Sequence, residues 1–271
     1  MKRIFIGFGV LIFLCGFLGI QEKTPPTLRN TSYGLGEQLE YRVHFGVFTV
    51  GKAMTVIDKK YHKINSRTCY KVDAYGETSD WISWVAKVND NWGAYVDTAT
   101  LLTHTAYRSL REGKYVRDEE VDFNNETQKA EVRVKNQTSG KIESKTYDVP
   151  PNAKDLVAGF LYLRVVDFTK ISVGDTITIS GFLEDASYNL KIVYRGKEVL
   201  KTRIGKIQCL RLSPVMPKNS LFDGEDSVLC WISDDLNRIP VKIQAKMFIG
   251  NTESSPSKSE FFGITGLNRK H

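Results

Sequence analysis

The histidines, cysteines and acidic residues are the groups through which this chain could do chemistry. The four histidines are His44, His62, His104 and His271, and no two of them have the spacing of metal ligands. The chain also lacks a G-x-S-x-G nucleophile turn, a phosphate-binding loop and a dinucleotide fingerprint. A Cys/His pair assembled only by folding stays open as an alternative. We therefore expect no enzymatic activity.

Three cysteines follow the first twenty residues: Cys69, Cys209 and Cys230. Each lies among strand-forming residues, where a free thiol behaves as a small apolar core residue. Their spacing fits neither a zinc site nor a disulfide scaffold. We expect three buried thiols, with one disulfide and one free thiol as the alternative.

Five carboxylates flank one predicted strand: Asp223, Glu225 and Asp226 before it, and Asp234 and Asp235 after it. Oxygen ligands of this kind suit calcium. However, a strand separates its two ends by about 20 Å, and Ser-Asp-Asp is also ordinary turn chemistry. We expect turns here, and neither a metal nor another cofactor.

Aromatic residues are the candidate ligand-binding groups. Trp81, Trp84 and Val85 have the i, i+3, i+4 spacing of a short amphipathic helix, and Trp92 follows. In one interpretation these rings cover the open end of a sheet, because a buried aromatic usually serves packing. In the other they form the mouth of an apolar pocket or a carbohydrate platform.

One apolar segment predicts a helix over Leu156–Val166, after the strand stop Pro150-Pro151-Asn152 and with Asp155 or Asn152 as its N-cap. The segment has almost no polar face, so the helix should be buried. Phe160 and Tyr162 of this helix complete the candidate ligand-binding set.

The rest of the chain has the alternating pattern and turn signals of antiparallel strands. The predicted strands are 39–45, 53–57, 69–75, 115–123, 129–135, 176–180, 188–194, 199–204, 208–213, 227–232 and 239–249. We therefore predict a mainly β protein in which a curled antiparallel sheet, an open or half barrel, packs around the one helix. Barrel, half barrel and sandwich share this strand pattern.

The first twenty residues have the layout of an export signal. Lys2 and Arg3 precede an uncharged apolar run from Ile4 to Ile20. We expect a cleaved signal peptide, with an uncleaved anchor as the second interpretation. Lipidation at Cys15 is the third, although Leu14 is not the small residue that a lipid-attachment cysteine normally follows.

The expected organisation is a leader over 1–20, an extended tether over 21–35, one β-rich domain over 36–250 and a polar tail over 251–271. The net charge of +7 is spread along the chain without a Lys/Arg block, which argues against nucleic acid as a partner. Membrane contact is expected only through an uncleaved or lipidated N-terminus.

Several segments together resemble an exported bacterial family known only as domain of unknown function 3108. They are Gly36 to Val43 with Val50 to Ala53, Asp155 to Arg164, Gly174 to Ile177, Gly205-Lys206 with Cys209, and Trp231 to Val241. The resemblance implies a bacterial periplasm or envelope, and no established activity or catalytic residue. We expect its signature residues to be structural: Gly36, Tyr41, Gly51, Asp155, Arg164, Gly174, Asp175, Trp231, Asp234, Asp235, Arg238 and Pro240.

The predicted architecture is similar to that of periplasmic lipoprotein carriers of the LolA and LolB kind, although a fold does not fix a function. The first hypothesis is a non-enzymatic envelope protein that binds a hydrophobic ligand or lipid. The second is an envelope interaction or glycan-binding module that uses Trp81, Trp84 and Trp92 on its surface. A hydrolase, with Asp234 near Glu225 in a cleft, is a distant third.

Overall fold

The computed structural model describes residues 27–85, 87–202, 204–216, 226–248 and 259–270. The strands are β1 (Gln38–Phe45), β2 (Phe48–Ile57), β3 (His62–Ile64), β4 (Arg67–Thr78), β5 (Asn89–Asp97), β6 (Thr103–Glu112), β7 (Tyr115–Asn124), β8 (Lys129–Lys135), β9 (Ile142–Asp148), β10 (Thr176–Leu183), β11 (Ala186–Thr202), β12 (Gly205–Pro214), β13 (Val228–Ser233), β14 (Pro240–Phe248) and β15 (Ser259–Lys270). The helices are α1 (Leu156–Val165) and the short 3-10 helix η1 (Phe168–Lys170).

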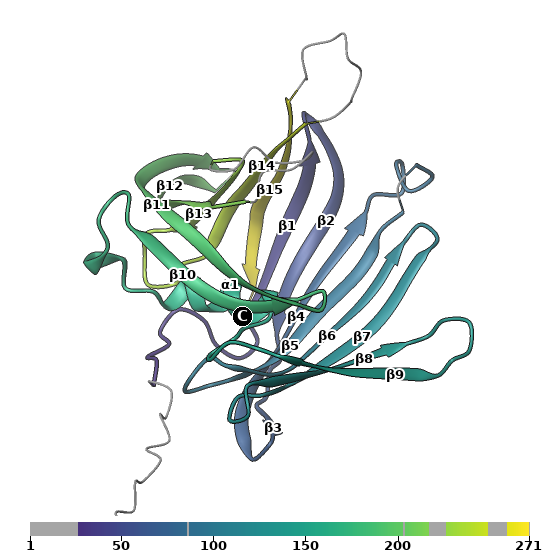
Figure 1. The fold of residues 1–271 in the computed structure, drawn as a ribbon. Coiled ribbons are helices and arrows are strands. Elements are labelled where there is room, and N and C mark those ends of the chain that lie inside the picture. The colour runs from purple at the N-terminus through teal and green to yellow at the C-terminus, as the bar shows by residue number, and fades with distance from the viewer. Residues whose placement is uncertain (1–26, 86, 203, 217–225, 249–258, 271) are drawn as a thin grey trace, which may run out of the picture.

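All the strands belong to one antiparallel sheet with the order β10-β11-β12-β13-β14-β15-β1-β2-β4-β5-β6-β7-β8-β9, and β3 pairs with β4. In Figure 1 the sheet curls into two arms, β10 to β13 on one side and β4 to β9 on the other, with α1 between them. The sheet is an open, barrel-like structure, as the sequence predicted. One parallel bridge between Lys154 and Gly181 links the segment before α1 to the edge strand β10.

The helix α1 fills the concave side of the sheet. Val157, Ala158 and Leu161 pack with apolar residues of β4 to β8, such as Val96. Leu163 packs with Ile192 and other residues of β10 to β13 in a second cluster. Burial of both faces explains why the helix is apolar nearly all round.

Asp155 is the N-cap of α1, and its carboxylate accepts hydrogen bonds from the backbone N–H groups of Val157 and Ala158. The hydroxyl of Thr103 also donates to this carboxylate over 2.8 Å, which anchors the start of the helix to β6. The predicted helix and one of its two predicted caps are therefore confirmed.

The C-terminal segment corrects our division of the chain. Residues 259–270 form β15, which pairs with β14 on one side and β1 on the other, instead of a polar tail. We did not predict this strand because a Ser-rich stretch precedes it, although its sequence includes Phe261, Phe262, Ile264 and Leu267. The β-rich domain therefore extends beyond residue 250.

The described part of the expected tether, residues 27–35, also differs from our prediction. It has no regular secondary structure, but Ser32 and Tyr33 are buried. The N–H group of Leu28 donates to the carbonyl of Ala99 over 2.7 Å. These contacts hold residues 27–37, which we call the strap, against the body of the protein.

Two local predictions are wrong for reasons of strand geometry. Residues 188–194 and 199–204 were expected to be separate strands, but β11 contains the first and runs into the second as far as Thr202, because a bulge at Gly196 with φ +89° absorbs the interruption. The strand predicted over 53–57 begins earlier, at Phe48, so Gly51 lies inside β2. A Cβ at Gly51 would lie 2.4 Å from the Glu77 carbonyl oxygen, so the close approach of β4 requires glycine.

The helix expected around Trp81 and Trp84 is also absent, and residues 80–85 form consecutive turns. Val85 donates its N–H to Ile82 over 2.9 Å, three residues back. The segment connects the adjacent strands β4 and β5. No helix in the described part of the chain is long and apolar enough to cross a membrane.

Candidate functional site

A cavity of about 250 Å³ lies where the strap, the β5–β6 loop, the start of α1 and the edge strand β10 meet. It is lined by Leu28, Thr100, Leu102, Pro151, Asn152, Lys154, Tyr162, Thr178, Ile179 and Ser180. Half of its lining is apolar side chain, and the rest offers hydroxyl groups, an amide and one ammonium group. We call it the Lys154 pocket. This mixture suits a ligand with both an apolar part and a polar group.

Lys154 is the only charged residue in this lining, and only 6% of it is exposed. Its backbone is fixed by two hydrogen bonds to β10, one from its N–H to Ser180 (3.0 Å) and one from the N–H of Phe182 to its carbonyl (3.0 Å). Its Nζ lies 5.2 Å from the centre of the Tyr162 ring. Within the described part of the chain, its ammonium group has no ion pair and no hydrogen bond.

Burial lowers the pKa of Lys154 to about 8, and the charge of Asp155 offsets only part of this effect. A lysine normally remains charged because water or a carboxylate solvates it. Here the ammonium group contacts the face of the Tyr162 ring. The pocket therefore contains a cation that an anionic ligand would stabilise.

The β5–β6 loop, which supplies Thr100 and Leu102, is held in a strained conformation. Leu101 is fully buried and has a φ of +54°, a left-handed conformation that costs roughly 1 kcal/mol in a residue with a Cβ. Asp97 compensates by accepting hydrogen bonds from the N–H groups of Ala99 and Thr100, each over 2.8 Å. Arg67 binds the other carboxylate oxygen of Asp97 over 2.6 Å. Strain held by its surroundings in this way often marks a functional loop.

Burial alone would raise the pKa of Asp97, but the hydrogen bonds from Arg67, Thr100 and Ala99 lower it to about 2. The carboxylate of Asp97 therefore stays ionised. Its negative charge holds the N–H groups of the loop at the edge of the Lys154 pocket.

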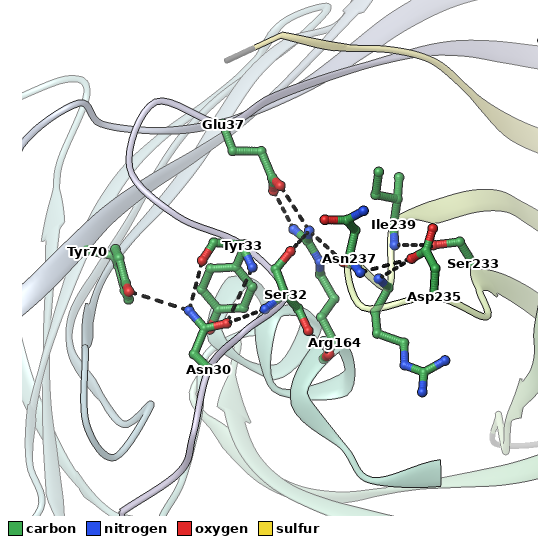
Figure 2. Close-up of polar contacts among 11 residues, drawn as sticks. Asn30, Ser32, Tyr33, Glu37, Tyr70, Arg164, Ser233, Asp235, Asn237 and Ile239 are labelled. Atoms are coloured by element: carbon green, nitrogen blue, oxygen red, sulfur yellow. Dashed lines mark hydrogen bonds and ion pairs between the residues drawn. The ribbon is translucent and has the colours of Figure 1, made fainter. Parts of the chain in front are cut away.

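Arg164 of α1 holds the strap that closes one side of this pocket (Figure 2). Its guanidinium group forms a buried ion pair with Glu37, with Nη1–Oε1 and Nη2–Oε2 distances of 2.5 and 3.0 Å. It also donates to the carbonyl of Ser32 (3.0 Å) and to that of Asn237 (2.9 Å). One arginine thus joins the helix, the strap and the β13–β14 turn, and we call this arrangement the Arg164 clasp.

The strap is shaped by its own side chains as well. The carboxamide oxygen of Asn30 accepts hydrogen bonds from the N–H groups of Ser32 (3.0 Å) and Tyr33 (3.3 Å). The Tyr33 ring then packs against the guanidinium group of Arg164, whose Cζ is 5.0 Å from the ring centre. Figure 2 shows these residues beside the clasp.

The β13–β14 turn is built by Asp235, whose carboxylate accepts from Ser233 Oγ and from the N–H groups of Asn237 and Arg238 (Figure 2). Asp234 binds Lys197 (2.6 Å) and Arg238 (2.9 Å). Turn hydrogen bonds therefore account for Asp235, and two ion pairs account for Asp234. Asp226 pairs with Arg195 (3.0 Å), whereas Asp223 and Glu225 lie outside the described residues.

In the described ranges no three His, Cys, Asp or Glu residues gather as metal ligands would.

A second, smaller cavity of about 30 Å³ lies between β5 to β7, the start of α1 and the end of β10, and is lined by Trp92, Arg108 and Glu119 among others. Arg108 lies over the Trp92 ring, with its Cζ 5.1 Å from the ring centre, and its Nε is 2.8 Å from Glu119. This space is about that of one water molecule. It is too small for an acyl chain.

The structure separates the five residues that were predicted to bind a ligand. Tyr162 lines the Lys154 pocket and Trp92 lines the smaller cavity. Phe160 is half-buried and lines neither of them. Trp81 and Trp84 are exposed on the β4–β5 turn. The three tryptophans therefore do not form a single patch.

The other signature residues have identifiable structural contacts. Gly36 has a φ of +78° at the turn into β1, and Gly174 has a φ of +96° before β10. Asp175 accepts from the N–H of Ser172 over 2.8 Å. The buried Trp231 donates its indole N–H to Glu198 over 3.0 Å. Tyr41 in β1 and Pro240 at the start of β14 are buried.

Cys69, Cys209 and Cys230 are free and buried, as expected. Burial raises the pKa of each thiol, to about 11, 11 and 12 respectively. Thiols of this kind are poor nucleophiles at neutral pH.

Sequence reasoning missed Lys154, the residue on which the pocket centres. In the sequence it is one more lysine beside a helix cap, and lysines are usually exposed. Its burial appears only in the folded structure, where its backbone is hydrogen-bonded to β10. Thr100 and Leu28 were missed for a different reason, since loop residues carry no periodic signal.

The fold defines a class of curled, open, barrel-like antiparallel proteins with a central helix. The chain belongs to the DUF3108 family of proteins of unknown function, whose model matches residues 40–254. No curated protein matches it. Its structure is similar to that of a beta-barrel-like protein of the domain of unknown function DUF1849 from Brucella abortus, with 9% identity, a TM-score of 0.46 and coverage of 86% of this chain and 98% of that one.

Proposed function

We propose that this protein is an exported, non-enzymatic protein of the bacterial envelope that binds a small amphiphilic anion in the Lys154 pocket. The observation that carries the proposal is the buried ammonium group of Lys154, which has no carboxylate partner in the described chain and faces a cavity of about 250 Å³. The leader-like first twenty residues support export.

The pocket favours a ligand with an apolar body and a carboxylate. Leu28, Leu102 and Ile179 offer apolar surface, and Thr100 offers a hydroxyl group. An anion would form a charge-assisted hydrogen bond with Lys154, which is stronger than a neutral one. The volume is slightly below the ~300 Å³ at the lower end of typical ligand pockets. We therefore infer a short acyl carboxylate instead of a complete phospholipid.

The test is to measure binding of octanoate and octanol by calorimetry, using the wild type, Lys154→Met and the control Lys170→Met, a lysine whose side chain is 82% exposed. We expect octanoate to bind the wild type and Lys170→Met, and to lose at least tenfold in affinity with Lys154→Met. Octanol should bind the wild type and Lys154→Met with similar affinity. Equal binding of octanoate by all three proteins, or none by the wild type, would contradict the proposal.

A second measurement identifies the natural ligand. Native mass spectrometry of protein purified from the bacteria that make it should show a bound small molecule, which solvent extraction then identifies. The same mass should be missing from Lys154→Met purified in parallel.

A further inference from the structure

A group of exposed apolar side chains lies at the end of the sheet where β1 turns into β2 and β4 turns into β5. Val47 and Phe48 occupy the first turn and are 89% and 63% exposed. Trp81, Trp84 and Val85 occupy the second and are 55%, 85% and 63% exposed. We call these five residues the tryptophan rim.

The two turns form one surface. The Phe48 and Trp81 rings have centroids 6.4 Å apart. The indole N–H of Trp81 donates to the carbonyl of Thr49 over 3.0 Å, which ties the β4–β5 turn to β2. Figure 1 shows both hairpins ending at the same end of the sheet. Isolated surface hydrophobic residues need no explanation, but a contiguous group of this kind marks an interaction site.

The hydrogen bonds of the indoles indicate what the rim contacts. Trp84 donates its N–H to the carbonyl of Trp81 over 3.0 Å, as Trp81 does to Thr49. Each indole thus uses its one donor inside the protein and presents only ring surface outside. A polar partner such as a glycan would find no free indole N–H donor here. In an apolar medium, neither indole N–H group would be left without a hydrogen-bond acceptor.

Two exposed lysines lie next to the rim. Lys87 is exposed at the end of the same turn, and the carbonyl of Lys87 accepts from the N–H of Gly113 over 2.7 Å. That contact brings the exposed Lys114 of the β6–β7 hairpin to the same end. Lys52 is paired with Glu77, and the other acidic residues at this end are Asp80 in the turn, and Asp90 and Glu112, which interact with each other beside the Val88–Glu112 bridge. Tryptophan flanked by lysine is the composition of a protein surface at a membrane interface.

We propose that the tryptophan rim docks the protein on a bilayer that contains anionic lipids. The apolar side chains insert at the level of the headgroups, and Lys87 and Lys114 bind the anionic lipids. Residues exposed to this degree project from the surface, which suits soft lipid better than a rigid protein partner. This contact is separate from any N-terminal anchor and from the Lys154 pocket.

The test is tryptophan quenching by vesicles of phosphatidylcholine and phosphatidylglycerol with bromine on their acyl chains. The protein is purified from the cells that make it, with its N-terminus as the cells leave it. Bromine quenches only rings that enter the lipid, so about half of the emission should be lost, because two of the four tryptophans lie in the rim. The buried Trp231 serves as an internal reference.

Variants distinguish the rim from other membrane contacts. Phe48→Ser with Val85→Ser retains every tryptophan and should abolish most of the quenching, whereas the control Val173→Ser, at another exposed apolar position, should not. Lys87→Glu with Lys114→Glu should weaken binding to anionic vesicles by roughly tenfold or more and leave binding to neutral ones unchanged.

Two results would overturn the proposal. The first is the absence of quenching in the wild type, even if an N-terminal anchor holds the protein on the vesicles. The second is quenching that Phe48→Ser with Val85→Ser leaves unchanged. If quenching is absent and sedimentation shows a dimer that the same variant dissociates, the rim is an interface between two copies of this chain.

Discussion

At the scale of single residues, Lys154 is placed for binding at a cost to stability. Burial lowers its pKa to about 8, so the charged form present at pH 7 is less stable in the folded chain than in water. We predict that Lys154→Met raises the free energy of unfolding of the ligand-free protein by roughly 1–3 kcal/mol while weakening anion binding. Urea unfolding measures the first effect, and Lys170→Met is the control. A Lys154→Met protein less stable than the wild type would contradict this prediction.

The same lysine sets a pH dependence for binding. An anion requires protonated Lys154, whose pKa in the free protein is about 8. Affinity for octanoate should therefore be constant below about pH 8 and fall by up to tenfold per pH unit above it. Octanol has no charge and should show no such dependence. Calorimetric titrations between pH 6 and 10 (roughly the range that spans this pKa) would detect the difference.

Asp97 contributes to the stability of the folded protein, and this contribution is lost in acid. Its pKa falls from 3.8 to about 2 on folding, and its side chain is 2% exposed. A lowered carboxyl pKa stabilises the folded state above the unfolded value and loses this effect as the pH falls towards the folded value. We predict that the stability advantage of the wild type over Asp97→Asn shrinks by about 2 kcal/mol between about pH 5 and pH 2. The exposed Asp148→Asn should show no comparable change in urea unfolding.

At the scale of elements, β15 is the clearest case for a test. Thr265 pairs with Arg42 of β1 and with Lys242 of β14, so a proline there removes a donor from a strand with partners on both sides. We predict that Thr265→Pro lowers the free energy of unfolding by roughly 3 kcal/mol, whereas Thr265→Ala costs about 1 kcal/mol or less. If both variants unfold like the wild type, residues 259–270 are not a central strand.

At the scale of the whole molecule, the Arg164 clasp holds together segments that are far apart in the sequence. Removal of one partner leaves a buried charge alone, which typically costs 3–5 kcal/mol. We predict that Glu37→Gln or Arg164→Met lowers the free energy of unfolding by this amount. The double variant Glu37→Met with Arg164→Met should lower it by less. Hydrogen exchange should show faster exchange in the strap. Unchanged protection of residues 27–37 in Glu37→Gln would show that the clasp does not hold the strap.

The sequence predicted much of the fold because its signals are local. The alternation in Lys129–Lys135 defined β8 to the residue, and the apolar run from Leu156 defined α1. Errors occurred where a local signal was ambiguous. The Gly196 bulge resembled a strand end, and the spacing of Trp81 and Trp84 resembled a helix, because neither pattern shows which strands lie next to each other.

The sequence by itself determined the β-rich class and the buried apolar helix, narrowed the cap of that helix to Asp155 or Asn152, and indicated the family, because periodicity, capping and turn chemistry act between residues close in the chain. Only the tertiary structure decided that β15 lies between β14 and β1, that Arg164 meets Glu37, and that Lys154 is buried in a pocket. Those facts depend on contacts between residues far apart in the chain, such as Glu37 and Arg164, which are 127 positions apart, and no local pattern records such contacts.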